Sequence, residues 1–525
     1  MLAFILIFAL IVRLGWALKR PTSDAALNLL PDQHDYLSLA RSVLHGDGFV
    51  FRDPRFPDEL KAFRTPGYPI FLAACGASVR VARAIQALID TSTILAIYCI
   101  ARKTIRSHRG DAVALAAAAL VAINPFLIYF SGLLLTETLF TAMLAWAMLL
   151  LVRASQSKGS VKRIEWLAAG LLLTTSILVR PSGIGLPVML ATAAVWVAGQ
   201  SGEGVKATKS DSEDRSSLKR SRHGLSSTLR LRPEGEAHVT GESFGASSAK
   251  DVSRSEGRPA SRDMGFQPMP KNPQTSPHAP TQQPPQNPQA ETPSSTGARS
   301  AENPCIPSAY QPGRIVCGVF LAASAMLLLT LLALLPWTIR NHAVLNRWVP
   351  LDTNSGFTLY DGFNPRATGA SDQTFVKQMP KLQSMDELRR SDYLASLAKR
   401  YIADHPARVI SLAVAKLART WSPITLSNEF GQLRYQLIAA GFAIPFDLLI
   451  IAGLFRGELS RGAKAFLLTP AVYFSIVHAL TVGSLRYRIP AEPPLAILAA
   501  VALFKVVEKM HSRPTCKAQT HRASW

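Results

Sequence analysis

Long apolar stretches recur along the chain, separated by polar segments. Runs such as MLAFILIFALIV and GVFLAASAMLLLTLLALL are apolar on every side. About 20 residues of helix cross a hydrocarbon core of about 30 Å, and a segment in lipid must satisfy its own backbone groups, which favours helix. We therefore predict an all-α polytopic membrane protein with about ten transmembrane helices. They are expected near residues 1–18, 81–100, 111–130, 133–152, 164–180, 183–199, 315–336, 436–455, 465–482 and 490–507.

The polar segments divide the chain into six predicted regions. Two stretches outside the apolar runs, 34–45 and 386–421, have apolar positions at helical spacing. The first predicts a short helix in the membrane interface. The second, in which Pro406 marks a helix start, predicts a small outer domain of helices. The regions are an N-terminal transmembrane region (1–199) whose first outer loop is 19–80, a linker (200–313), a transmembrane helix (314–336), an outer loop region with helices (337–435), C-terminal transmembrane helices (436–508) and a basic cytoplasmic tail (509–525).

Residues 200–313 differ in composition from the rest of the chain. They are rich in Ser, Pro, Gln and charge and contain few apolar residues. Such a segment buries too little surface to offset the entropy of ordering, so we expect a disordered cytoplasmic linker. It is either a tolerated insertion or a docking tail.

The formal charge of +22 is explained by membrane topology rather than by a nucleic-acid partner. Lys and Arg accumulate in cytoplasmic loops. The connectors ARKTIRSHRG and RASQSKGSVKR and the tail after Lys505 are basic, and alternating the spans places all three on one side. The loops 19–68 and 337–435 then lie outside the cytoplasm. We expect a multi-pass protein of the plasma (bacterial inner) membrane.

Three acids are candidate catalytic residues on the outer side. Asp32 and Asp35 follow the first span, and Glu137 lies at the outer end of the fourth. A carboxylate at the edge of the hydrocarbon is costly and marks a functional candidate. Each also has a structural interpretation: either aspartate could cap a helix, and Glu137 could extend to the headgroup level. The placement favours chemistry on a lipid-linked substrate.

Several arginines lie on the outer face, where the positive-inside rule does not place them. Arg180, Arg340, Arg486 and Arg488 end or begin spans, and Arg64 precedes a Pro-Gly-Tyr-Pro turn. Each could be an anchor that reaches the interface. Together they suit a phosphate, because guanidinium groups bind its oxygens in a fork geometry.

Other motifs of known chemistry do not occur in the sequence. There is no phosphate-binding Gly-rich loop, dinucleotide fingerprint or serine-hydrolase elbow, so a nucleotide donor is not expected. The His and Cys residues have no metal-site spacing. No metal ligand is assigned, and a divalent cation is left open as a cofactor.

An ordered set of segments resembles the family 39 group of the GT-C superfamily of membrane glycosyltransferases. The segments are PDQHDYLSLARSVLHGDGF, FRTPGYPIFLA, RAIQALIDTSTILAIY, NPFLIYFSGLLLTETLF, LVRPSG, PWTIRNHAVLNRWVPLDTNSGFTLYDGFNP and RYRIPAEPPLAILA. The group includes protein O-mannosyltransferases, the aminoarabinose transferase of lipid A and bacterial lipid-core sugar transferases. Its first outer loop typically has an acidic pair followed by a tyrosine. Asp32 and Tyr36 match, whereas Gln33 replaces the second acid.

The resemblance implies a GT-C-like bundle with interfacial helices and an active site facing the outer leaflet. It further implies a polyprenyl-phosphate sugar donor, an inverted product, and an acceptor hydroxyl on a glycolipid, glycan or protein. Asp32 is the expected base, assisted by Glu137 or Asp35. The predicted substrate-binding residues are Tyr36, Arg64, Tyr68, Arg180, Arg340, Asn341, Arg486, Tyr487 and Arg488.

Two other functions stay open at this point. A transporter or flippase of lipid-linked sugars would also need outer arginines and acids, but it should have polar residues deep within several spans and matched halves. A non-catalytic membrane scaffold would recruit partners through 200–313 and would make no demand on Asp32.

Overall fold

The chain folds almost wholly into helices, as its apolar pattern predicts. The computed structural model describes residues 1–105, 109–197, 312–426 and 432–511, and these belong to one unit by their contacts. The predicted linker falls outside the described residues except for its last two positions, and so does the tail beyond residue 511.

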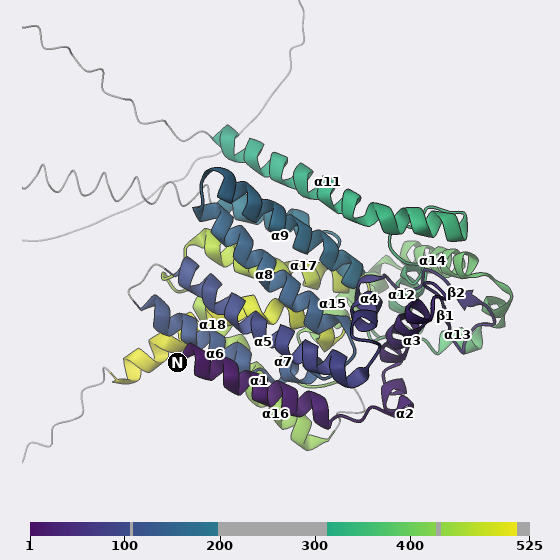
Figure 1. Cartoon of the computed structure of the whole chain (residues 1–525), viewed down its shortest axis with the longest axis horizontal. Coiled ribbons are helices and arrows are strands. Elements are labelled where there is room, and N and C mark those ends of the chain that lie inside the picture. Colours follow the sequence, from purple (N-terminus) through teal and green to yellow (C-terminus); the bar gives the residue numbers. More distant parts are fainter. Residues whose placement is uncertain (106–108, 198–311, 427–431, 512–525) are drawn as a thin grey trace, which may run out of the picture. The chain divides into compact units, whose positions relative to one another are not determined.

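Long helices run side by side in a bundle (Figure 1). They are α1 (Leu2–Lys19), α5 (Val79–Thr104), α6 (Gly110–Ile123), α7 (Pro125–Ser131), α8 (Thr136–Gln156), α9 (Gly159–Val179), α11 (Pro312–Leu345), α16 (Leu433–Leu454), α17 (Arg461–Ala479) and α18 (Glu492–His511). A further apolar helix covers Pro181–Val197.

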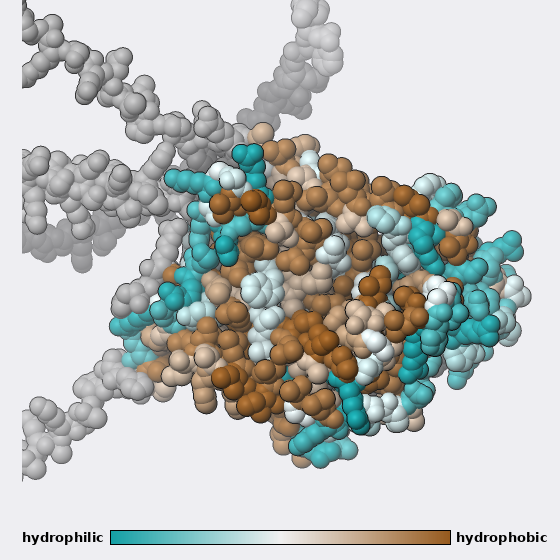
Figure 2. All heavy atoms as spheres, viewed as in Figure 1, coloured by the Kyte–Doolittle hydropathy of each residue, from teal (hydrophilic) through white to brown (hydrophobic). Residues whose placement is uncertain are grey.

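Six helices within the described ranges are long and apolar enough to cross a membrane, and the bent pair α6–α7 would make a seventh. The other three predicted spans are also helices: α9, Pro181–Val197 and α17. They are shorter or more polar than a lone span requires. The outward apolar side chains form a band between two hydrophilic ends (Figure 2). An all-α polytopic membrane protein is thus confirmed.

The bend between α6 and α7 is a feature that the apolar run 111–130 did not predict. The two helices meet at 53° around Asn124, whose side chain accepts hydrogen bonds from the backbone N–H groups that open α7. Arg13 of α1 donates to the carbonyls of Val121 and Ala122 at 3.0 and 2.8 Å, and it pairs with Asp90 of α5 at 2.5 Å. The carbonyls that the bend frees inside the bundle therefore keep partners.

Short elements gather at the hydrophilic end that carries the first acid loop (Figure 1). The helices predicted for 34–45 and 386–421 are present there, and Pro406 begins the last of them. The elements are α2 (Asp24–Asn28), α3 (Pro31–His45), the antiparallel strands β1 (Phe51–Arg52) and β2 (Glu59–Leu60), α4 (Gly67–Ala74), α12 (Ser355–Gly362), α13 (Phe375–Gln378), α14 (Glu387–Asp404) and α15 (Pro406–Thr420).

Gly67 allows α4 to begin directly against α9. A Cβ atom at this position would lie 2.7 Å from the backbone of Leu178 and Val179. Only a glycine fits such an approach, which places the start of α4 against the end of α9, three residues after Arg64. Packing between distant segments thus positions the first loop.

Candidate active site

A cavity of about 840 Å³ lies where the outer segments meet α7 and the start of α16. One side is apolar and is formed by Trp16, Pro125, Ile128, Tyr129, Leu133, Leu135, Tyr435 and Ile438. The other side is polar and is formed by Asp32, Arg64, Asn354, Thr358, Asp361, Ser371, Gln373, Arg419 and Arg486. The cavity can therefore hold an amphipathic ligand, with an apolar part and a charged or hydroxylated part.

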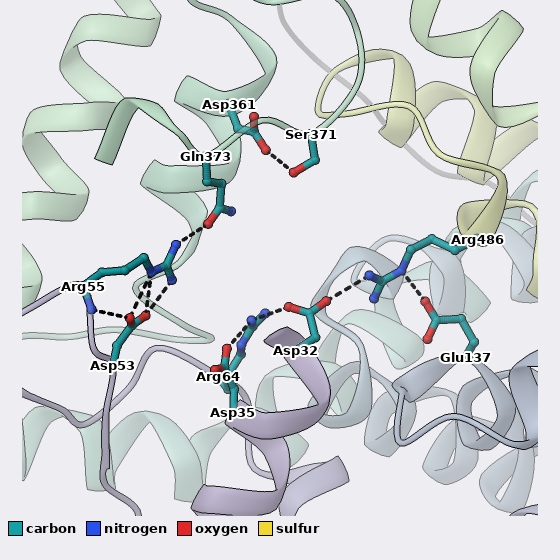
Figure 3. A network of polar contacts seen from close by, with 10 residues as sticks. All are labelled: Asp32, Asp35, Asp53, Arg55, Arg64, Glu137, Asp361, Ser371, Gln373 and Arg486. Atoms are coloured by element: carbon teal, nitrogen blue, oxygen red, sulfur yellow. Dashed lines mark hydrogen bonds and ion pairs between the residues drawn. The ribbon is translucent and has the colours of Figure 1, made fainter. Parts of the chain in front are cut away.

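Asp32 lies at the centre of a chain of ion pairs on the polar side (Figure 3). Its Oδ1 accepts from Arg64 Nη2 at 2.5 Å, and its Oδ2 accepts from Arg486 Nη1 at 2.9 Å. The same Arg64 nitrogen donates to Asp35 Oδ2 at 2.6 Å. The Asp32 side chain keeps 28% of its surface exposed, toward the cavity. Arg64 and Arg486 thus share the carboxylate of Asp32, from which Arg486 is 454 positions away in the chain.

The chain of ion pairs continues into the bundle at Glu137. Its Oε1 accepts from Arg486 Nε at 2.6 Å and pairs with Arg180 Nη1 at 2.9 Å. The Glu137 side chain has no exposed surface and does not line the cavity. It therefore holds the two arginines in place, which is a positioning role.

Buried carboxylates in this cluster have shifted proton affinities. Burial alone would raise the pKa of Asp32, but the guanidinium groups of Arg64 and Arg486 hold the pKa of that carboxyl well below its usual range. Burial raises the pKa of Asp35, and the single cation Arg64 only partly offsets that effect. Burial also raises the pKa of the Tyr36 hydroxyl to about 12, so Tyr36 stays protonated beside Asp32. Asp32 is the acid that stays ionised and faces the cavity.

Five of the predicted site residues line the cavity. They are Asp32, Tyr36, Arg64, Arg486 and Tyr487. Asp35, Glu137 and Arg180 contact these residues from behind. Tyr68 lies farther from the cavity. Its hydroxyl donates to Gln86, and its ring packs edge-on against that of Tyr36 with 5.0 Å between the ring centroids.

Arg340, Asn341 and Arg488 lie outside the cavity and hold the backbone together. Arg340 donates to the carbonyls of Lys61 and Phe49, and Asn341 donates to Val349. Arg488 pairs with Glu492 at 2.7 Å and is buried. The contacts of Arg340 join α11 to the first outer loop, whereas those of Asn341 and Arg488 with Val349 and Glu492 are local in the sequence.

Sequence reasoning missed Arg419 and the polar wall that we define as Asn354, Thr358, Asp361, Ser371 and Gln373. Arg419 lies near the end of the amphipathic stretch 386–421. A basic residue in such a helix is expected on the face exposed to solvent. The polar wall lies in the segment TNSGFTLYDGFNP and in the residues just after it. That segment contributed to the family resemblance, but no binding role was predicted for its polar residues. The sequence signal that could have identified these residues is their position in a predicted outer loop.

A metal site is not evident from the side chains. Within the described residues, no group of three or more His, Cys, Asp or Glu side chains is placed to hold a metal ion. The divalent cation left open by the sequence stays a prediction.

Comparison with known proteins gave one family match and two structural matches. Residues 68–204 match the family described as dolichyl-phosphate-mannose-protein mannosyltransferase. This match covers about a quarter of the chain and supports its predicted membership of the GT-C superfamily of membrane glycosyltransferases. A search of curated proteins gave no match.

The two structures are of the oligosaccharyltransferase of Archaeoglobus fulgidus. The first is in complex with an inhibitory peptide and a dolichol-phosphate, and it is 11% identical with a TM-score of 0.44. The second carries a tethered acceptor peptide, and it is 13% identical with a TM-score of 0.45. Each match covers 97% of this chain, which spans about half the length of those proteins (51% and 50%).

Proposed function

We propose that this chain is a glycosyltransferase of the GT-C superfamily that moves a sugar from a polyprenyl phosphate to an acceptor hydroxyl. The transfer takes place on the extracytoplasmic side of the plasma membrane and inverts the anomeric centre. The family match over residues 68–204 supports the reaction class. The observation that carries the proposal is Asp32, an ionised carboxylate held by two arginines in a cavity with an apolar side.

The apolar side of the cavity suits the isoprenoid chain of the donor. Trp16 of α1, Ile128 of α7 and Ile438 of α16 all face it, and these helices belong to the membrane-spanning bundle. An isoprenoid chain that lies among such residues is shielded from water. The reacting end of the donor then lies at the polar side.

Arg419 is our candidate ligand for the donor phosphate. The cluster around Asp32 contains three guanidinium groups (Arg64, Arg180, Arg486) and three carboxylates (Asp32, Asp35, Glu137), so its charges balance. Arg419 also lines the cavity, its Nε is buried without a hydrogen-bond partner, and no ion pair holds it within the described part of the chain. A phosphate would supply the missing partner.

The proposed step transfers the sugar in one displacement. The acceptor oxygen attacks the anomeric carbon, and the bond from that carbon to the phosphate oxygen breaks. The bonding electrons leave with the lipid phosphate, whose negative charge Arg419 stabilises. The acceptor proton passes to Asp32, which Arg64 and Arg486 keep ionised.

Replacement of the carboxylate tests the proposal directly. In purified full-length protein, we expect Asp32→Asn to lower transfer from undecaprenyl-phosphate mannose or glucose by at least about 100-fold, because general bases contribute about that much. Binding of undecaprenyl phosphate should survive. Asp24→Asn changes an exposed acid of the neighbouring helix and should keep full activity. Undiminished transfer by Asp32→Asn would eliminate the base role.

A second substitution tests the phosphate site. Arg419→Gln should weaken binding of undecaprenyl phosphate by about tenfold, since charge-assisted hydrogen bonds contribute about 1.5–3 kcal/mol. Arg408→Gln, a change of an exposed arginine on the same helix, should leave binding unchanged. Equal lipid affinities for both variants would place the phosphate elsewhere.

A further inference from the structure

The polar wall of the cavity has no role in the proton transfer. Its residues come from the outer segment between α11 and α14. The Asp32 cluster comes from α3, the first outer loop, α8, the end of α9 and the segment before α18. Both sets face the same cavity. The wall is built from amide, hydroxyl and carboxylate groups.

Two members of the wall are held in fixed orientations. Asp361, which is 3% exposed, accepts from Ser371 Oγ at 2.6 Å and from the backbone N–H of Asp372 at 2.7 Å. Gln373 Oε1 accepts from Arg55 Nη1 at 2.6 Å, and Arg55 itself is held by Asp53 (Figure 3). That bond assigns the amide orientation and leaves its NH₂ group as a donor without a partner in the described residues.

The wall also has an unsatisfied acceptor. Asn354 Oδ1 is buried and has no hydrogen-bond partner in the part of the chain that the structure describes. An unpaired buried carbonyl is destabilising unless a ligand or water satisfies it. The wall thus presents one free donor and one free acceptor, and a hydroxyl group can use both because it donates one hydrogen bond and accepts others.

We infer that Asn354, Asp361 and Gln373 form a subsite for the hydroxyl groups of a sugar ring, and that this subsite selects the sugar. The inference rests on the proposed function and deepens it. The ring belongs either to the donor or to an acceptor glycan, since both present the same hydroxyls.

Binding measurements on the full-length protein test the subsite without requiring turnover. The ligands are undecaprenyl phosphate, its mannosyl and glucosyl forms, and maltotriose as a soluble glycan. Gln373→Ala and Asn354→Ala each remove one hydrogen-bonding group, and Gln373→Glu keeps the contact with Arg55 while losing the NH₂ donor. Gln378→Ala, an exposed glutamine outside the cavity, is the matched control.

A donor subsite predicts that a glycosylated lipid binds more tightly than undecaprenyl phosphate and that each wall variant loses about fivefold of that gain. Binding of the bare lipid phosphate and the behaviour of the control should not change. An acceptor subsite predicts instead that maltotriose binding is lost while the lipid affinities stay equal. The inference is overturned if no saccharide adds affinity, or if all wall variants bind every ligand as the wild type does. If the wild type binds a sugar but transfers none, the proposed function is rejected while the subsite inference stands.

Discussion

Asp32 owes its charge to two arginines from opposite ends of the chain. Arg64 comes 32 residues later and Arg486 comes from the start of the last span. Because both cations stabilise the ionised form, they oppose the effect of burial and hold the pKa of Asp32 low. The carboxylate can accept a proton only weakly at equilibrium, so it suits a step in which the proton moves as the new bond forms.

Removal of one arginine should make transfer sensitive to acid. In Arg64→Gln the pKa of Asp32 rises, so the base is protonated at a higher pH than in the wild type. The acid limb of the pH–rate profile should therefore move toward neutral pH by roughly one to three pH units, the usual effect of one nearby opposite charge. Because the limb starts well below the usual aspartate pKa of about 4, kcat/KM should be measured from neutral pH down to the lowest pH at which each variant keeps its native helix content.

Asp352 is the control for that profile. Burial raises its pKa to about 6, and it also lies near Arg64, but it does not line the cavity. Asp352→Asn should leave the acid limb where it is. If the acid limb moves in Asp352→Asn, or if it stays fixed in Arg64→Gln, Asp32 is not the titrating base.

At the scale of elements, one buried ion pair supports the carbonyls at the bend between α6 and α7. Arg13 and Asp90 are almost fully buried, and Arg13 also satisfies two carbonyls at the bend. Since α7 forms part of the apolar side of the cavity, this pair links the membrane bundle to the site. The link explains why a charged residue lies in the first apolar run.

Breaking the pair should destabilise the fold more than removing both partners. Asp90→Leu leaves an unpaired buried guanidinium and should lower stability by about 3–5 kcal/mol. The double variant Arg13→Leu and Asp90→Leu should recover part of that loss, because no uncompensated charge remains. Thermal unfolding in detergent would measure both. Equal losses in the single and double variants would show that the carbonyl contacts, not the ion pair, dominate.

Hydropathy predicted the helices but not their partners. The apolar run 111–130 was predicted as one span, although Asn124-Pro125 within it is a helix-start signal: Asn124 caps the N–H groups of Phe126 and Leu127. Arg340 and Arg488 were predicted to bind phosphate because they lie at the ends of spans. In the structure, Arg340 donates to backbone carbonyls and Arg488 pairs with Glu492. Arg419 was missed for the converse reason: tertiary packing turns a residue of an amphipathic helix into the cavity.

At the scale of the molecule, acid loops and basic connectors lie at opposite ends of the bundle. The outer helices and the cavity lie at one end, and the α8–α9 connector around Lys158 lies at the other (Figure 1). This separation matches the proposed orientation, with the cavity outside the cytoplasm.

Labelling of single cysteines would test the orientation. In intact cells that carry a cysteine-free variant, Gln378→Cys should react with a membrane-impermeant maleimide, and Lys158→Cys should react only after the cells are permeabilised. Both positions are exposed, so access to reagent is set by the membrane and not by packing. The reverse pattern would place the cavity in the cytoplasm.

The contact of Arg486 with Asp32 and Glu137 sets the order in which the site can be made. A ribosome releases both acids into the translocation machinery long before it reaches Arg486, which is 349 residues after Glu137. Until then Arg180 is the cation that can neutralise Glu137 inside the membrane. Assembly of the site therefore waits for insertion of the segment that carries Arg486, and a nascent chain that has not reached this residue lacks the cation that joins Asp32 to Glu137.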